Sequence, residues 1–169
     1  MRAFFLSSVL VLLLACGPTQ SAAPPDRRGE TRSLLPEGRL HLPEFGPEEF
    51  QALLRELRGR PVVVNIWGSW CPPCQVEAPE LAKVAREFEG RVQFVGVDIL
   101  DSRGSARTFI LIHDWPYPSV FDPDGEIRDR LGYVGQPVTV VYDSAGEVAF
   151  EWPGIITEDL LREEIDKVL

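Results

Sequence analysis

Two cysteines separated by two prolines are the residues of this sequence best suited to do chemistry. Cys71 and Cys74 follow an apolar run, Val62–Trp67, that is typical of a buried strand, and they precede a helical pattern. The start of a helix lowers the pKa of a cysteine, because the helix dipole and unpaired N–H groups stabilise the thiolate. The second cysteine lies one turn further on, within reach of a mixed disulfide formed by the first. The spacing predicts a reversible dithiol–disulfide pair, with Cys71 as an exposed nucleophile and Cys74 as the more buried resolving thiol.

The alternative for this pair is half of a metal site. Zinc takes four ligands in a structural site, and the two histidines, His41 and His113, have no recognisable ligand spacing. With three cysteines in the chain, a disulfide scaffold is excluded, and the 71–74 pair is the only internal bridge that the pattern supports. We therefore expect redox chemistry without a metal or any other bound cofactor.

The composition of the chain excludes several classes of partner. The sequence has 169 residues, enough for one domain with a core, and its formal net charge is -9. An acidic chain lacks the basic surface that binds nucleic acid or anionic lipid headgroups. No internal repeat and no second hydrophobic block are present, so we expect one globular domain. A monomer is a separate expectation that does not follow from these features.

The first residues resemble a bacterial lipoprotein signal. Arg2 precedes an apolar stretch that ends in Leu13-Leu14-Ala15-Cys16 and is too short for a finished membrane span. We predict a signal peptide over residues 1–15 and lipidation of Cys16. The alternative is ordinary secretory cleavage after Ala23.

A flexible tether is expected between the lipidated cysteine and the domain. Residues 16–39 are rich in Pro, Arg, Ser and Gly and lack apolar periodicity. The domain itself is expected over residues 40–169. The predicted N-terminal signal leads us to expect the domain outside the cytoplasm, anchored to a bacterial membrane, where disulfides persist and a dithiol needs a dedicated electron source.

The remainder of the chain alternates between helical and strand periodicity. Helices are predicted over residues 50–57, 74–88, 106–113 and 126–131 and after Thr157, and strands over residues 61–67, 92–98, 119–122, 138–142 and 147–152. Strand–helix units that end in a hairpin and a helix predict an α/β domain of three layers.

With these elements placed, the chain resembles the membrane-anchored thiol–disulfide oxidoreductases of the TlpA/ResA-like family, which have a thioredoxin fold. The most specific piece is the run 64–74, Val-Asn-Ile-Trp-Gly-Ser-Trp-Cys-Pro-Pro-Cys, followed by Glu77, Pro79 and Leu81. A second piece, Gly135-Gln136-Pro137, resembles the cis-proline loop of the family. The resemblance implies a three-layer α/β/α fold with a central mixed sheet, and an extra α/β insertion over residues 101–125.

Glu77 is the candidate proton acceptor. It lies one turn after Cys74 and, if buried, could take the proton of that thiol, with its own pKa raised by desolvation. A solvated surface glutamate is the alternative. The resemblance favours the first interpretation. Plain thioredoxin has a buried aspartate where this chain has Asn65, so no carboxylate is available there, and Glu77 is the substitute carboxylate that the family pattern offers.

Five residues around the predicted dithiol are expected to contact the substrate: Trp70, Pro72, Pro73, Gln136 and Pro137. Trp70 is predicted to form an apolar rim beside the sulfurs. A cis bond before Pro137 would leave the backbone of Gln136 free to pair with an extended substrate segment. A trans proline that opens a strand is the alternative.

A lipid-anchored reductase is the function that these features favour together. The Pro72-Pro73 dipeptide contains no histidine that would stabilise the thiolate, so the disulfide should be harder to reduce and the dithiol a better electron donor. A membrane thiol carrier is the expected donor, and the resemblance implies exported disulfide proteins such as apocytochrome c as substrates. The alternatives are an oxidase or isomerase, a copper or zinc carrier, and a docking module.

Overall fold

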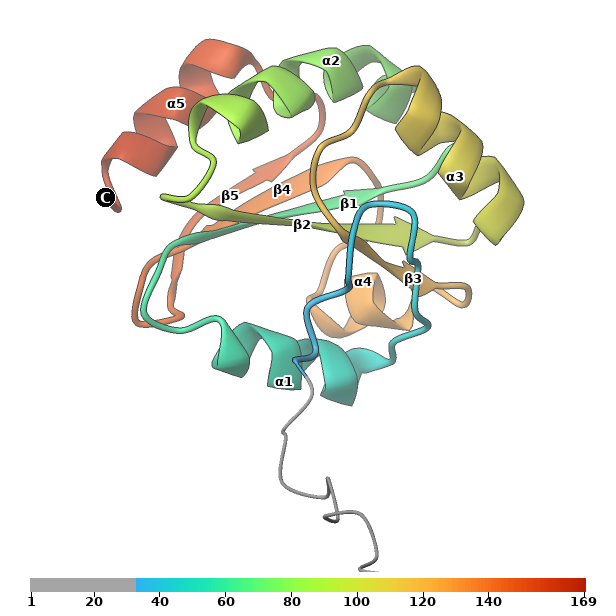
Figure 1. The fold of residues 1–169 in the computed structure, drawn as a ribbon, viewed down its shortest axis with the longest axis horizontal. Coiled ribbons are helices and arrows are strands. Elements are labelled where there is room, and N and C mark those ends of the chain that lie inside the picture. The colour runs from blue at the N-terminus through green and yellow to red at the C-terminus, as the bar shows by residue number, and fades with distance from the viewer. Residues whose placement is uncertain (1–32) are drawn as a thin grey trace, which may run out of the picture. The chain divides into compact units, whose positions relative to one another are not determined.

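The computed structural model describes residues 33–169, which form a five-stranded mixed sheet with helices on both faces (Figure 1). The strands are β1 (Val62–Trp67), β2 (Gln93–Ile99), β3 (Ser119–Asp122), β4 (Val138–Tyr142) and β5 (Val148–Pro153), and the helices are α1 (Pro47–Glu56), α2 (Pro72–Glu87), α3 (Arg103–Ile112), α4 (Glu126–Arg130) and α5 (Glu158–Asp166). The predicted signal peptide, Cys16 and the tether up to residue 32 lie outside the described residues.

The strand order is β3-β2-β1-β4-β5. β2 is parallel to both β1 and β3, while β4 is antiparallel to β1 and β5. Helices α2, α3 and α5 cover one face of the sheet, and α1 and α4 cover the other (Figure 1). The predicted α/β/α layering is confirmed, and residues 101–125, predicted as an insertion, contain α3 and the edge strand β3.

The central strand β1 is buried on both faces. Its alternate residues Val62, Val64 and Ile66 pack on the α1 side, whereas Val63 and Trp67 pack on the α2 side. A strand covered on both faces needs apolar side chains in both directions, which explains its nearly continuous apolar run. The exception in this run is Asn65, a fully buried amide.

The segment before α1 belongs to the folded domain. Leu34 and Leu35 pack against the cluster on the α1 side, and the backbone N–H of Leu34 donates to a carboxyl oxygen of Glu56 at 2.9 Å. The prediction of a flexible tether up to residue 39 is therefore wrong for residues 33–39. Two leucines inside a Pro- and Gly-rich stretch supply the apolar surface that fixes this segment.

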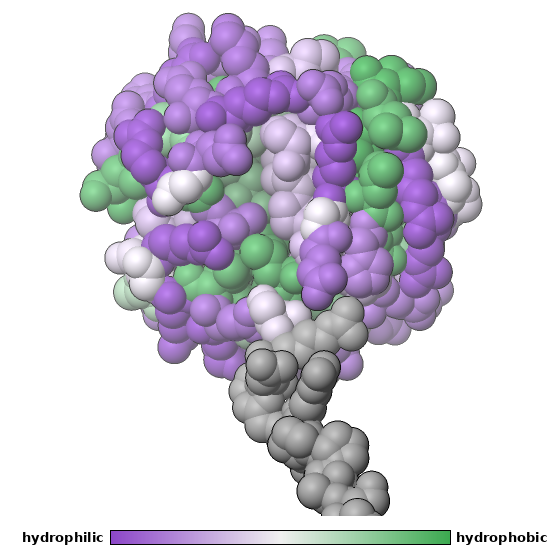
Figure 2. Space-filling model, in the orientation of Figure 1, coloured by the Kyte–Doolittle hydropathy of each residue, from purple (hydrophilic) through white to green (hydrophobic). Residues whose placement is uncertain are grey.

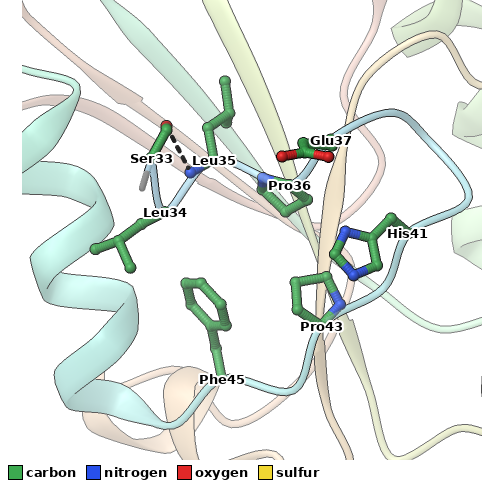
Figure 3. A pocket seen from close by; sticks show the side chains of 8 residues that line it. All are labelled: Ser33, Leu34, Leu35, Pro36, Glu37, His41, Pro43 and Phe45. Carbon is green, nitrogen blue, oxygen red and sulfur yellow. Dashed lines mark hydrogen bonds between the residues drawn. The ribbon is translucent and has the colours of Figure 1, made fainter. Parts of the chain in front are cut away.

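Residues 33–45 also line a pocket of about 380 Å³ (Figure 3). Phe45, Pro43 and the segment 33–37 form its wall together with His41. None of the predicted site residues lines this pocket.

The outer edge of β3 is covered by the chain that leads into α1. The backbone N–H of Phe121 donates to the carbonyl of Pro43 at 2.8 Å, and the N–H of Phe45 donates to the carbonyl of Phe121 at 3.0 Å. These bonds extend the sheet locally in the parallel sense.

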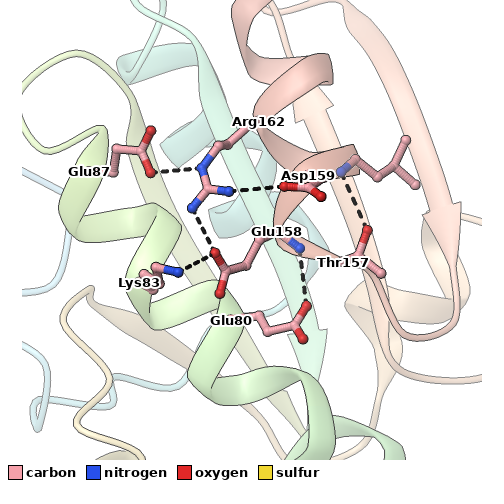
Figure 4. A network of polar contacts seen from close by, with 8 residues as sticks. Glu80, Lys83, Glu87, Thr157, Glu158, Asp159 and Arg162 are labelled. Atoms are coloured by element: carbon pink, nitrogen blue, oxygen red, sulfur yellow. Dashed lines mark hydrogen bonds and ion pairs between the residues drawn. The ribbon is translucent and has the colours of Figure 1, made fainter.

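An ionic network joins α2 to α5 (Figure 4). Arg162 reaches Glu87 at 2.8 Å and Glu158 at 2.7 Å, and Lys83 reaches Glu158 at 2.6 Å. The backbone N–H of Glu158 donates to Glu80 at 3.0 Å. These contacts connect the helix that carries the cysteines to the last helix of the chain.

The face seen in Figure 2 is mainly hydrophilic, with an apolar area over α3, where Leu111 and Ile112 are exposed. Among the residues that the structure describes, no helix has the length and apolar character needed to cross a bilayer.

Candidate active site

Cys71 and Cys74 form a disulfide where β1 leads into α2. Cys71 is the N-cap residue of α2, and its sulfur accepts a hydrogen bond from the backbone N–H of Cys74 at 3.2 Å. Pro72 and Pro73 occupy the first helical positions, where the helix does not use their missing N–H groups. The same N–H of Cys74, together with the helix dipole, would stabilise a thiolate at Cys71 after reduction.

The disulfide is more buried than the sequence predicted. Cys71 is 2% exposed and Cys74 is 0% exposed, so the prediction of an exposed Cys71 is wrong for this oxidised form. The loop before β4 accounts for the burial, since the carbonyl oxygen of Gln136 lies 3.9 Å from the sulfur of Cys71. Trp70, predicted at an apolar rim, is 47% exposed.

The peptide bond between Gln136 and Pro137 is cis, as predicted. Pro137 is buried and its carbonyl accepts the backbone N–H of Gly154 at 2.8 Å, whereas Gln136 is half-buried. A groove of about 300 Å³ runs along this loop, lined by residues 132–138 with Pro153 and Gly154. The loop thus places the backbone of Gln136 beside both the disulfide and an open groove.

Glu77 is buried, so the alternative of a solvated surface glutamate is wrong. One of its carboxyl oxygens accepts the side-chain amide of Asn65 at 2.9 Å, and the other accepts the backbone N–H of Ile156 at 3.1 Å. Burial raises the pKa of Glu77 to about 7, against the opposing effect of these two hydrogen bonds. A carboxyl group with a pKa near neutrality can both take and return a proton at physiological pH.

The loop that leads into Cys71 is held by two residues that were not predicted. The backbone N–H of Ser69 donates to a carboxyl oxygen of Asp101 at 2.7 Å, and the side-chain amide of Gln75 donates to the carbonyl of Ser69 at 2.8 Å. Asp101 follows β2, whose carboxyl end lies beside that of β1. Sites in α/β sheets form at the carboxyl ends of the strands. The position of Asp101 shortly after the predicted strand could therefore have indicated it as a site residue.

The described residues 33–169 contain no group of three or more His, Cys, Asp or Glu side chains placed to hold a metal ion.

The mixed sheet, the Cys-x-x-Cys disulfide at the start of a helix and the cis-proline beside it together define a protein with a thioredoxin-like fold. The chain belongs to the AhpC/TSA family, whose model matches residues 42–151. It is similar to the thiol:disulfide interchange protein DsbE of Pseudomonas aeruginosa, with 34% identity over 65% of this chain and 60% of that protein. It is also similar to the thiol-disulfide oxidoreductase ResA of Bacillus subtilis, with 28% identity over 68% of this chain and 65% of that protein.

A solved structure supports the same fold. A secreted Mycobacterium tuberculosis disulfide oxidoreductase, described as homologous to Escherichia coli DsbE, superposes with a TM-score of 0.62 and 28% identity, covering 67% of this chain and 85% of that one. The resemblance to thioredoxin-fold thiol–disulfide oxidoreductases is thereby confirmed. The chain spans 60% of the length of the P. aeruginosa relative.

Proposed function

We propose that this protein is an extracytoplasmic thiol–disulfide oxidoreductase that reduces disulfides in exported proteins, with apocytochrome c as its substrate class. The observation that carries the proposal is the Cys71–Cys74 disulfide at the start of α2, beside the backbone of Gln136. The buried Glu77, one turn further along the same helix, supports it. The relatives named thiol:disulfide interchange protein and thiol-disulfide oxidoreductase support the same class of reaction.

The reaction begins with the reduced protein. The Cys71 thiolate attacks one sulfur of the substrate disulfide, whose S–S bond breaks, and the other substrate sulfur leaves as a thiolate that takes up a proton. Cys74 then gives its proton to Glu77 and attacks the sulfur of Cys71. The S–S bond between Cys71 and the substrate breaks as the 71–74 disulfide forms, and the second substrate sulfur leaves as a thiolate that takes up a proton. Two electrons have moved from the protein to the substrate, and a membrane thiol donor returns them.

Trp70, Pro72, Pro73, Gln136 and Pro137 are the proposed substrate contacts. Trp70 is exposed beside the disulfide, and the groove along the Gln136 loop is the proposed place for an extended polypeptide. The proposal also includes export by the signal peptide and anchoring through lipidated Cys16. Release of the full-length protein from membranes by Cys16→Ser would support the anchor.

The reduction potential tests the direction of electron flow. Equilibration with a thiol redox buffer should give a potential below roughly -200 mV, because higher values belong to disulfide oxidants and isomerases. A potential well above that range contradicts the reductase and favours the oxidase or isomerase.

Trapping tests the substrate class. Cys74→Ser should accumulate a mixed disulfide between Cys71 and an oxidised Cys-x-x-Cys-His peptide, since the resolving thiol is missing. Cys71→Ser is the matched control and should form no adduct. Equal labelling of both variants, or stoichiometric copper or zinc that is lost in Cys71→Ser, would overturn the proposal.

A further inference from the structure

Asp98 is a buried acid without a hydrogen-bond donor. It lies in β2 and is 0% exposed, and its neighbours Val97 and Ile99 point to the α1 side of the sheet. Since side chains alternate along a strand, Asp98 points to the α2 side, where the cluster contains Cys71. Among residues 33–169, no N–H or O–H group donates to either of its carboxyl oxygens.

The charged groups that act most strongly on Asp98 are two further acids. Asp101, in the loop after β2, lies close enough to the Asp98 carboxyl group to act on it, and Asp122, at the end of β3, adds a second negative charge. Burial and these two acids raise the pKa of Asp98 to about 9. A buried carboxylate without donors is strongly unfavourable. Asp98 therefore keeps its proton at neutral pH, and Asp101 is the acceptor available to it.

Asp101 also contacts the loop that leads into the nucleophile Cys71. One of its oxygens accepts the backbone N–H of Ser69 at 2.7 Å, and the other accepts the N–H of Ser102 at 2.6 Å. The loop is a tight turn, because the N–H of Cys71 donates to the carbonyl of Gly68 at 3.1 Å. A Cβ at Gly68 would lie 2.8 Å from the indole nitrogen of Trp70, so the turn leaves no room for a side chain at this position.

We propose that protonated Asp98 donates a hydrogen bond to Asp101 and that Asp101, through the backbone of Ser69, positions Cys71 for attack on a disulfide. Both are positioning residues, because they act through Ser69 and not on the sulfur itself. When Asp98 loses its proton, two adjacent carboxylates repel each other and the bond to Ser69 weakens. This inference deepens the proposed function, since it concerns the reactivity of the same thiol.

The test compares Asp98→Asn with Asp98→Ala in the full chain. An asparagine N–H can donate to Asp101 as the protonated acid does, whereas alanine cannot. At pH 7 the reduced Asp98→Asn protein should react with a small aromatic disulfide at the wild-type rate, while Asp98→Ala should react about 10-fold more slowly, the effect of one lost hydrogen bond. Above pH 9 the wild-type rate should fall relative to that of Asp98→Asn.

Asp143→Asn is the matched control. Asp143 accepts backbone N–H groups in the turn between β4 and β5, so the same chemical change there should leave the rate and its pH profile unaltered. Protection of the Ser69 amide from hydrogen exchange, measured by NMR, should be lost in Asp98→Ala and kept in both asparagine variants.

Three results would overturn the inference. They are full Ser69 protection in Asp98→Ala, identical alkaline profiles for wild type and Asp98→Asn, or an Asp98 carboxyl carbon that titrates near the ordinary aspartate pKa. The last two remain decisive if Asp98→Ala does not fold. Amide exchange and the carboxyl titration need no redox activity, so failure here is separate from failure of the proposed reductase function.

Discussion

The carboxyl group of Glu77 ties together three segments that lie far apart in the sequence. It joins α2 to Asn65 in β1 and to Ile156 just before α5. A change in its charge therefore acts on β1 and on the segment that leads into the last helix at once. Asn65, noted in the sequence for the carboxyl group that it lacks, supplies the amide that fixes this glutamate.

Glu77→Gln should slow the resolving step. Glutamine keeps the shape of the side chain but cannot accept the Cys74 proton, and a lost general base costs about 100-fold in rate. The measurement is the lifetime of the mixed disulfide after rapid mixing with an oxidised peptide. Glu80→Gln, on the same helix, is the control. A lifetime unchanged by Glu77→Gln would remove Glu77 from the mechanism.

The same substitution should flatten the pH dependence of stability. The pKa of Glu77 is raised from 4.5 to about 7, so the folded state prefers the protonated form. Its stabilising contribution is complete below pH 4.5 and is lost as the pH rises through 7. Denaturant unfolding should show wild type losing more stability than Glu77→Gln between about pH 5 and 8. Parallel curves would contradict the raised pKa.

Residue types and spacing were enough to predict the cysteine pair, and the resemblance to the family's cis-proline loop predicted the cis bond before Pro137. The burial of Cys71 was not predictable, because it depends on Gln136, brought over the sulfur by a loop 65 residues away. The sequence analysis did not identify Asp98 as a candidate residue. A single acid inside an apolar strand does not indicate which charged groups the fold will place around it.

At the scale of elements, the ion pairs between α2 and α5 are partly exposed. Arg162 shares its guanidinium with acids on both helices, and its side chain is 26% exposed. Hydrogen bonds to Glu87 and Glu158 raise the pKa of Arg162, and Lys83 and Arg162 lower the pKa of Glu158. Such contacts are weakened by salt.

Arg162→Gln should lower the melting temperature slightly in dilute buffer, because α2 and α5 lose their shared cation. The difference from wild type should shrink in 1 M salt, where the Debye length falls to about 3 Å. Arg130→Gln, which removes a single exposed ion pair to Glu48, is the control and should change little. A difference that is independent of salt would indicate packing instead of charge.

The periodic segments were predicted with the correct type and order. Most of them bury an apolar face, whereas β5, whose residues are exposed or half-buried, was predicted together with the turn before it. Their starts were less accurate. α3 begins at Arg103 and not at residue 106, because Ser102 caps a first turn made of polar residues that carry no apolar signal. α2 begins at Pro72 and not at residue 74. Proline is favoured at the first helical position because the N–H that it lacks is not used there.

At the scale of the whole molecule, the N-terminal segment is part of the fold. Leu34→Ala combined with Leu35→Ala should lower the free energy of unfolding by about 2 kcal/mol, since both side chains pack against the α1 cluster. Denaturant unfolding of the full chain measures it. Leu40→Ala, at a position that is 39% exposed, is the control. No loss in the double variant would return residues 33–39 to the tether.

The two edges of the sheet differ in how accessible they are to other chains. Residues 43–45 cover the outer edge of β3, which leaves β5 as the open edge of the described sheet. There the exposed Glu151 contributes a negative charge and Pro153 lacks an N–H group, both of which oppose the addition of a foreign strand. These two residues therefore disfavour aggregation of the protein with its proposed extended substrates through strand addition at β5.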